Sequence, residues 1–267
     1  MNLVITGSSS GIGKFLADSL TARGHAICRL ARSPQDGFSF RCDVSDWPTL
    51  QHCARAVARK WGILDGLICC AGVQEPIGLA MEIDPSAWRK NLGVNLDGTF
   101  FAIRAFYPLL KKTSRRAKVI CFSGGGSTRP RPNFAAYSIA KTGVVRLVET
   151  LAAEWHGSPL DINAVAPGAI FTRMTEQVLA RGAALAGQAE FESASNLSRD
   201  NCGKLEQVFG LVEFLLSEKS DGITGKLISA VWDPWEKLHE FKKDLGSDIY
   251  TLRRVVPKDR GKTWGGK

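Results

Sequence analysis

This chain alternates short, almost continuously apolar runs with longer segments of helical periodicity, and this order constrains its fold more than any other feature. Strands that are apolar on both faces are typical of a parallel sheet covered by helices on both sides. We therefore predict an α/β fold with a single domain, a doubly wound Rossmann-type parallel sheet with helices on both faces. The predicted strands are residues 3–6, 25–31, 38–43, 64–70, 118–123, 161–166 and 226–231, and the predicted helices are residues 12–23, 47–61, 85–112, 133–156 and 204–217.

The first predicted strand runs directly into a glycine-rich loop, Thr6-Gly7-Ser8-Ser9-Ser10-Gly11-Ile12-Gly13, and a helix follows. Glycines allow the backbone to turn tightly and to approach a pyrophosphate, whose charge is met by free N–H groups and by the positive end of the helix. A glycine-rich loop alone is a weak signal, but here strand, loop and helix come in the required order. The loop therefore predicts a bound dinucleotide.

The residue type at the end of the second predicted strand indicates whether that dinucleotide carries a 2′-phosphate, as NADP does, or lacks it, as NAD does. An acidic residue there would bind both hydroxyls of the adenosine ribose and would repel a 2′-phosphate. This chain has Leu30-Ala31-Arg32 instead. Because Arg32 can make a charge-assisted contact to a phosphate, we expect NADP as the cofactor; if Arg32 is only a solvated loop residue, NAD stays possible.

Tyr137 and Lys141 stand four residues apart in a predicted helix and therefore share one face of it. A reductase must deliver a proton to a carbonyl oxygen as hydride reaches the carbon. A phenol with its usual pKa of about 10 is poorly matched to neutral pH, and a nearby lysine ammonium is expected to lower that pKa. We predict Tyr137 as the catalytic acid/base and Lys141 as its electrostatic partner.

Taken together, these motifs resemble the short-chain dehydrogenase/reductase family, and the resemblance covers nearly the whole chain to Val231. The TGxxxGIG loop has the spacing of that family, Tyr137 and Lys141 match its YxxxK pair, and residues 65–72 match its fourth strand and NNAG turn. Further matches are Asp43-Val44, the pair that contacts adenine, and Pro167-Gly168-Ala169-Ile170-Phe171-Thr172, the PGxxxT segment. The resemblance implies an oxidoreductase that transfers a hydride between a nicotinamide and a carbonyl or alcohol.

The resemblance also implies roles for individual residues. Asn95 is implied as the anchor of a water relay behind Lys141, although an asparagine within a helix could also bond to the backbone and kink it. Lys141 is implied to bind the nicotinamide ribose as well. The implied cofactor-binding residues are Gly7, Ser8, Ser10, Gly11, Ile12, Gly13, Arg32, Asp43, Val44, Ala71, Gly72, Tyr137, Lys141, Pro167, Gly168, Ile170 and Thr172.

Two positions depart from the family pattern. The NNAG turn reads Cys69-Cys70-Ala71-Gly72, and cysteine forms the hydrogen bonds of asparagine poorly. The catalytic serine, thirteen residues before the tyrosine in that family, is Gly124 here.

Three groups could replace this serine, whose hydrogen bond to the substrate oxygen can change rates by orders of magnitude. Ser123 is our preferred candidate, Ser127 the second, and the backbone N–H groups of the glycine run at 124–126 the third. The missing serine also leaves open a catalytically impaired NADP-binding or regulatory protein of the same fold. The joint presence of Asn95, Tyr137 and Lys141 favours the enzyme.

No domain boundary is visible before about residue 233, so we expect residues 1–233 to form one dinucleotide-binding catalytic domain. Residues 172–201, rich in Ala, Gly, Ser and Gln, follow a strand end and are expected to form a mobile lid over a small polar substrate. Residues 234–267 are expected to be a C-terminal extension and not a separate domain. Two roles for it stay open, packing at a subunit interface or a basic cover for an anionic or sugar-like substrate.

Composition excludes several other classes of protein. The net charge is +9, but Lys and Arg are scattered among acidic residues, so we expect no nucleic-acid partner. No apolar stretch is long enough to predict a transmembrane helix, and the cysteines lack metal-ligand spacing, so we expect no membrane association and no metal. The cysteines and the uncharged N-terminus favour a cytoplasmic protein. The expected assembly is a homodimer or homotetramer, and a sugar epimerase or dehydratase ranks below the reductase because its loop spacing differs.

Overall fold

The computed structural model describes the whole chain except residues 34–35, 199, 201 and 265–267. Its sheet has seven parallel strands in the order β3-β2-β1-β4-β5-β6-β7, so the winding direction changes between β1 and β4. The predicted doubly wound parallel sheet is therefore confirmed. The strands are β1 (Asn2–Thr6), β2 (Ala26–Ala31), β3 (Ser39–Arg41), β4 (Gly66–Cys69), β5 (Ala117–Phe122), β6 (Leu160–Ala166) and β7 (Leu227–Ser229).

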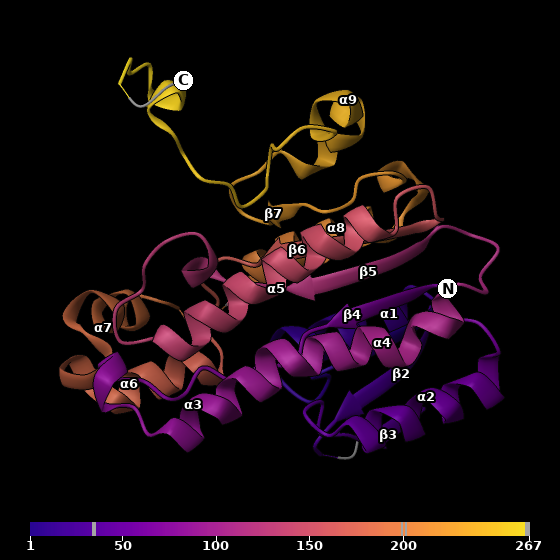
Figure 1. Cartoon of the computed structure of the whole chain (residues 1–267). Coiled ribbons are helices and arrows are strands. Elements are labelled where there is room, and N and C mark those ends of the chain that lie inside the picture. The colour runs from indigo at the N-terminus through magenta and orange to yellow at the C-terminus, as the bar shows by residue number, and fades with distance from the viewer. Residues whose placement is uncertain (34–35, 199, 201, 265–267) are drawn as a thin grey trace.

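Helices cover both faces of this sheet (Figure 1). One apolar core joins the sheet to α2, α4 and α5 and includes the fully buried Phe106 and Val148. The other joins it to α1 and α8 and includes Leu16 and Leu211. Each such side chain contributes about 1.5–3 kcal/mol of burial free energy. The helices are α1 (Gly11–Ala22), α2 (Trp47–Trp61), α3 (Pro85–Leu92), α4 (Gly98–Leu110), α5 (Ala135–Glu154), α6 (Arg173–Ala186), α7 (Gln188–Ser195), α8 (Cys202–Leu216) and α9 (Lys242–Leu245).

The helix predicted over residues 85–112 is interrupted, and in this respect the prediction was wrong. A π-helical turn over Gly93–Asp97 separates α3 from α4. At this turn the side-chain amide of Asn95 donates to the backbone oxygen (3.1 Å) and to Oδ1 (3.0 Å) of Asn91. The start of α3 is as expected, since Asp84 accepts hydrogen bonds from two backbone N–H groups of the first turn.

The predicted lid region folds into α6 and α7, which lie together beyond the carboxyl ends of the strands (Figure 1). Thr172 caps α6 through a hydrogen bond from the Met174 N–H. Gly182 and Gly187, both with positive φ, break the helical path and allow the two helices to turn back on each other. Residues 199 and 201 of the predicted lid lie outside the described residues.

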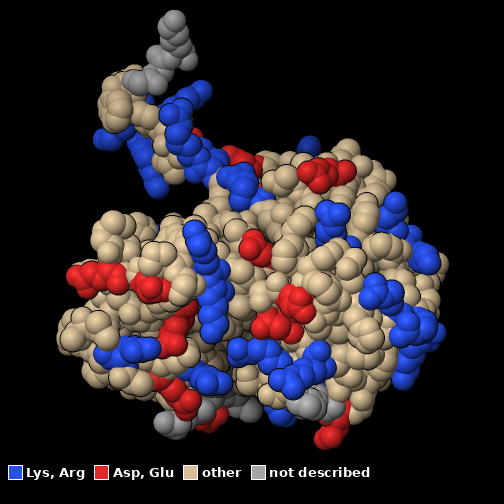
Figure 2. All heavy atoms as spheres, turned by 60° about the horizontal axis from the view of Figure 1, so that its bottom comes forward, with Lys and Arg blue, Asp and Glu red and all other residues tan. Residues whose placement is uncertain are grey.

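The C-terminal extension packs on the sheet and then projects from it. Leu238 and Leu245 are buried in the second core, and the Trp235 ring lies against Gly210 of α8. The chain then runs outward as an arm over residues 253–264, which carries Arg253, Arg254, Lys258, Arg260 and Lys262 (Figures 1 and 2). The last three residues of the predicted extension are not described. Among all the residues that the structure describes, no helix combines the length and apolarity needed to cross a bilayer.

Candidate active site

A cavity of about 680 Å³ lies beyond the carboxyl ends of β1, β2 and β4. Its floor is the glycine-rich loop between β1 and α1, where a Cβ on Gly13 would lie 2.4 Å from the backbone oxygen of Gly7. Ser10 makes no capping hydrogen bond from its side chain to α1, so the first-turn N–H groups are left for a ligand. A close backbone approach next to a free helix N-terminus suits a pyrophosphate.

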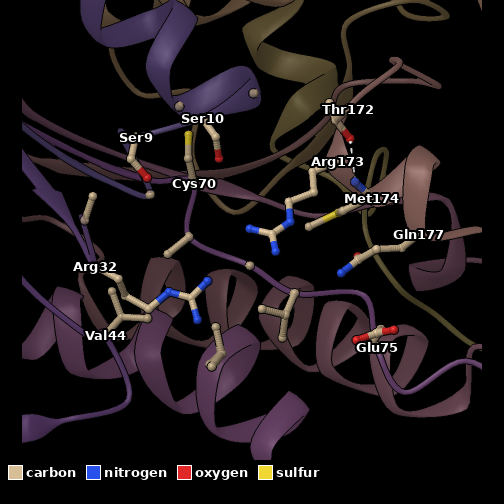
Figure 3. A pocket seen from close by; sticks show the side chains of 18 of the residues that line it. Ser9, Ser10, Arg32, Val44, Cys70, Glu75, Thr172, Arg173, Met174 and Gln177 are labelled. Carbon is tan, nitrogen blue, oxygen red and sulfur yellow. Dashed lines mark hydrogen bonds between the residues drawn. The ribbon is translucent and has the colours of Figure 1, made fainter. Parts of the chain in front are cut away.

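At one end of this cavity the lining groups suit an adenosine with a 2′-phosphate. Arg32, from the end of β2, points into the cavity beside Val44 (Figure 3). Lys90 of α3 lines the same region. Burial alone would raise the pKa of Asp43, but hydrogen bonds from Ser45 and the charges of Arg32 and Lys90 lower it. Two cations and one carboxylate therefore meet where the sequence predicted the adenosine end.

Most of the predicted cofactor residues line this first cavity, with one exception in the loop. Ser8 is fully buried and its hydroxyl donates to Leu30, whereas its neighbour Ser9 lines the cavity. The predicted residues found in the lining are Gly7, Ser10, Gly11, Ile12, Gly13, Arg32, Asp43, Val44, Ala71, Gly72 and Thr172.

A second cavity, of about 980 Å³, adjoins the first. It is lined by three of the predicted catalytic residues, Ser123, Tyr137 and Lys141, and by Pro167, Gly168 and Ile170, whereas the predicted catalytic residue Asn95 is fully buried behind it. Several residues line both cavities and form a shared boundary. A dinucleotide bound in the first cavity would reach the second cavity at this boundary. These shared residues are Ile12, Cys70, Gly72, Thr172 and Met174.

Tyr137 and Lys141 lie on the same face of α5, and both are almost completely buried. Lys141 Nζ donates to the backbone oxygen of Phe122 at 2.9 Å and lies 5.7 Å from the centre of the Tyr137 ring. Burial lowers the pKa of Lys141 to about 8. Burial raises the pKa of Tyr137, and the opposing influence comes from Arg131. The expected lowering of the tyrosine pKa by Lys141 is therefore wrong for this cavity, because the lysine is itself desolvated and directed at a backbone oxygen.

Gly124 stands where the family has its serine, and Tyr137 occupies the space that a side chain at position 124 would need. A Cβ on Gly124 would lie 2.9 Å from Tyr137 Oη. Both candidate serines line the second cavity, but each hydroxyl already donates to a backbone oxygen. Ser123 Oγ donates to Lys141 at 3.3 Å, and Ser127 Oγ donates to Gly124 at 2.8 Å.

Asn95 organises the turn that separates the two cavities. Its Oδ1 accepts from the Val73 N–H at 3.2 Å, and its Nδ2 donates to the Val73 oxygen at 2.8 Å. A Cβ on Gly72 would lie 2.9 Å from Asn95 Oδ1 and 3.5 Å from Lys141 Nζ. The side-chain amide thus positions the backbone at which a nicotinamide would arrive, close to the lysine.

Comparison with known proteins decides the family. A family model described as enoyl-(acyl carrier protein) reductase matches residues 7–230. The chain belongs to the short-chain dehydrogenase/reductase family. It is 30% identical to galactitol 2-dehydrogenase of Cereibacter sphaeroides, over 84% of this chain and 91% of that protein. It is 28% identical to 3-oxoacyl-[acyl-carrier-protein] reductase of Thermotoga maritima, over 84% and 94% of the two chains. The aldohexose dehydrogenase of Thermoplasma acidophilum has the same fold, with a TM-score of 0.74 over 85% and 91% of the two chains, at 22% identity.

The sequence of this short-chain dehydrogenase/reductase gave no sign of an ion pair that ties the lid to the active site. Arg131 donates from Nε and Nη2 to the two carboxylate oxygens of Glu190 on α7, at 2.7 and 2.8 Å. The same guanidinium stacks 4.0 Å above the Phe134 ring and lies 5.8 Å from the centre of the Tyr137 ring. A second ion pair joins Arg181 on α6 to Glu75, and both residues line the first cavity.

Three further groups of the dehydrogenase/reductase were missed. Arg173, the first residue of α6, points into the first cavity from the side opposite Arg32 (Figure 3). Tyr250 of the C-terminal extension and Asp233, directly before that extension, line the second cavity. A basic residue directly after the PGxxxT segment could have indicated Arg173. No sequence pattern marks the other two, because only the folded extension brings them together.

Proposed function

We propose that this enzyme transfers a hydride between NADP(H) and a carbonyl or alcohol of a small, polar, hydroxylated substrate, with Tyr137 as acid/base. The observation that carries the proposal is the shared boundary of the two cavities. A dinucleotide whose phosphates lie on the glycine loop would extend to Gly72, which lines both cavities. Tyr137 and Lys141 line the second cavity, on the far side of Gly72. When bound, the nicotinamide supplies or accepts the hydride.

The protein residues then handle the proton and the orientation of both partners. Tyr137 Oη holds the proton that the substrate oxygen receives during reduction and takes it back during oxidation. Lys141, released from the Phe122 oxygen, binds the nicotinamide ribose. Asn95 holds the turn at Gly72 and anchors a water relay to the lysine. Ser123 donates to the substrate oxygen once its hydroxyl turns away from the Lys141 oxygen.

The cofactor residues fit NADP better than NAD. Arg32 and Lys90 supply two positive charges where the 2′-phosphate would lie, and Arg173 supplies a third opposite the glycine loop. Asp43 and Val44 line the space for the adenine.

A neutral hydroxylated substrate fits the second cavity because its lining charges are nearly balanced, with Arg129, Arg131 and Lys141 against Glu190 and Asp233. The guanidinium of Arg131 is already neutralised by Glu190, and a second carboxylate, that of Asp233, faces the same cavity. Relatives named for galactitol, D-threitol and aldohexose are consistent with a sugar or polyol.

The role of Tyr137 is tested by removing its hydroxyl. Tyr137→Phe is expected to lower kcat for NADPH-dependent reduction of small hydroxyketones by about 10²–10⁴-fold and to leave NADPH affinity within about threefold. Tyr107→Phe is the matched control, since Tyr107 stacks on Trp155 and does not line either cavity. Equal activity in the two variants would refute the role of Tyr137.

The cofactor preference is tested by reversing the charge of Arg32. Arg32→Glu is expected to raise the NADPH dissociation constant by about 10–100-fold, because charge-assisted hydrogen bonds to the phosphate are lost, and to change NADH binding far less. Arg41→Glu is the control, since Arg41 at the end of β3 is exposed and outside the cavity. An unchanged ratio of the two affinities, measured by fluorescence titration, would mean that Arg32 does not select the cofactor.

The alternative function is a catalytically impaired NADP-binding or regulatory protein of the same fold, and the missing serine is the observation in its favour. Proteins of this family are usually oligomeric, and we expect a homodimer or homotetramer here. A cytoplasmic location stays a prediction.

A further inference from the structure

The second cavity is bounded on one side by the C-terminal extension. One wall of this cavity, which also contains Tyr137, consists of residues from this extension or directly before it: Trp232, Asp233, Tyr250 and Thr251. The family model matches the chain only to residue 230, so this wall lies beyond the matched part. The extension therefore supplies part of the substrate site.

The wall is fixed to the edge of the sheet. The Leu227 N–H of β7 donates to the backbone oxygen of Tyr250 at 2.9 Å, which adds the segment to the sheet edge. Lys226 Nζ donates to the backbone oxygens of Ser247 (2.8 Å) and Ile249 (3.0 Å). The Leu252 N–H donates to the Glu149 carboxylate of α5 at 2.6 Å. These bonds fix the backbone on both sides of Tyr250 without any ligand.

Asp233 and Tyr250 form a polar pair on this wall. The Asp233 carboxylate accepts the Ser229 N–H at 2.6 Å and is hydrogen-bonded to the Tyr250 hydroxyl. Partial burial raises the pKa of Asp233. Beside the pair, the Trp232 side chain is 83% exposed and offers an apolar ring face to the cavity. A carboxylate and a phenol beside an exposed indole can accept and donate hydrogen bonds to hydroxyl groups while the ring covers C–H groups.

The spacing of the strands gives the distance from this pair to the reacting centre. Tyr137 lies above Gly124 at the end of β5, and Asp233 is bonded to the end of β7, with β6 between them. Two strand spacings amount to about 10 Å. A six-carbon polyol built from C–C bonds of about 1.5 Å covers most of that distance when extended, whereas a three-carbon polyol covers less than half.

We propose that Asp233 and Tyr250 form a distal subsite that binds the far hydroxyl groups of an extended polyol or open-chain sugar while its reacting carbon lies at Tyr137. This inference rests on the proposed function, since it takes Tyr137 as the reacting end. The extension thereby selects substrates by length and hydroxylation.

Calorimetric titration of galactitol and glycerol into the NADPH-saturated enzyme tests the subsite, because the reduced cofactor cannot oxidise an alcohol and binding is measured without turnover. Asp233→Asn keeps an acceptor for Ser229, and Tyr250→Phe keeps the backbone bond to Leu227. Each is expected to weaken galactitol binding by about tenfold, as for a lost hydrogen bond to a charged group, and to change glycerol binding by less than about twofold. Asp248→Asn is the matched control, because Asp248 pairs with Arg253 outside the cavity.

Three results would each overturn the subsite: equal losses of affinity for both polyols, no loss of affinity in either variant, or no binding of galactitol to the wild type. The proposed function fails by a different result, the absence of NADPH binding. In that case the same titrations without cofactor would still decide whether Asp233 and Tyr250 bind a polyol.

Discussion

At the scale of single residues, the contact between Gly124 and Tyr137 is the most specific feature of the site. The backbone at Gly124 is extended, with φ −173° and ψ 172°, a conformation open to any residue. The constraint is space, since an added Cβ would lie 2.9 Å from the tyrosine oxygen and 3.4 Å from its Cε1. The absence of the usual serine is thus matched by a tyrosine that has taken its volume.

Restoring the serine is therefore expected to harm this enzyme. Gly124→Ser is predicted to lower kcat by about tenfold or more, because the phenol must move and small displacements of reacting groups cost about 10²-fold per ångström. Gly125→Ser is the control, since no atom lies within 4 Å of a Cβ at that position. A rise in kcat for Gly124→Ser would show that the tyrosine can make room and that the serine is the missing donor.

The buried lysine predicts how the rate depends on pH. Below about pH 8 Lys141 carries a proton, and above about pH 8 the positive charge that binds the ribose is lost. The value of kcat/KM for NADPH, which reports groups of the free enzyme, should fall above about pH 8. An arginine at position 141 keeps its charge across this range. Any activity that Lys141→Arg retains should therefore not fall above about pH 8. A wild-type profile that is flat to pH 10 would contradict this account.

At the scale of elements, few of the polar contacts identified in the described chain hold α6 and α7, the predicted lid, in place. Besides the Arg131–Glu190 and Arg181–Glu75 pairs, Asn133 Nδ2 donates to the Leu185 oxygen at 2.7 Å. Behind these bonds lies a small apolar cluster centred on Phe134. A lid held by so few groups can open as a unit, and its opening can limit product release.

Weakening one ion pair should therefore speed that opening. Glu190→Gln is expected to raise the NADP⁺ release rate several-fold, because a charge-assisted bidentate pair becomes a neutral hydrogen bond. Glu192→Gln on the same helix is the control, since Glu192 bonds only to Gln188 among the interactions identified in the described chain. Stopped-flow release that is equally fast in both variants and the wild type would mean that the pair does not hold the lid.

The elements themselves could be predicted from sequence where periodicity alone defines them. All the predicted strands are present, although β3, β4 and β7 are each three residues shorter than expected. The alternative that Asn95 bonds to the backbone and kinks the helix agrees with the turn at Gly93–Asp97, where its amide donates to the Asn91 backbone oxygen. The bonds of Asn91 and Asn95 to a loop from another part of the chain could not be predicted. Likewise, the region of α6 and α7 was predicted only as a lid rich in small and polar residues, without its helices.

At the scale of the whole molecule, the phosphate end of the site was predictable and the substrate end was not. The glycine loop, Arg32 and Asp43 are local to strand ends, so their place follows from the fold. Arg131 and Glu190 are 59 positions apart, and Asp233 meets Tyr250 only through the path of the extension. Contacts of this kind depend on tertiary packing that no local pattern records.

The central claim is that a hydride passes from the first cavity to a substrate in the second, and deuterium transfer tests it most directly. The enzyme would be incubated with NADPH carrying deuterium on the transferred position of nicotinamide C4 and a series of hydroxyketones of increasing length, and the products analysed by mass spectrometry. We predict one deuterium on the newly formed carbinol carbon in the wild type and in Tyr107→Phe, and about 10²–10⁴-fold less deuterated product in the same time in Tyr137→Phe. Tight binding of NADPH with no deuterium in any product would contradict the account and identify a cofactor-binding protein without catalysis.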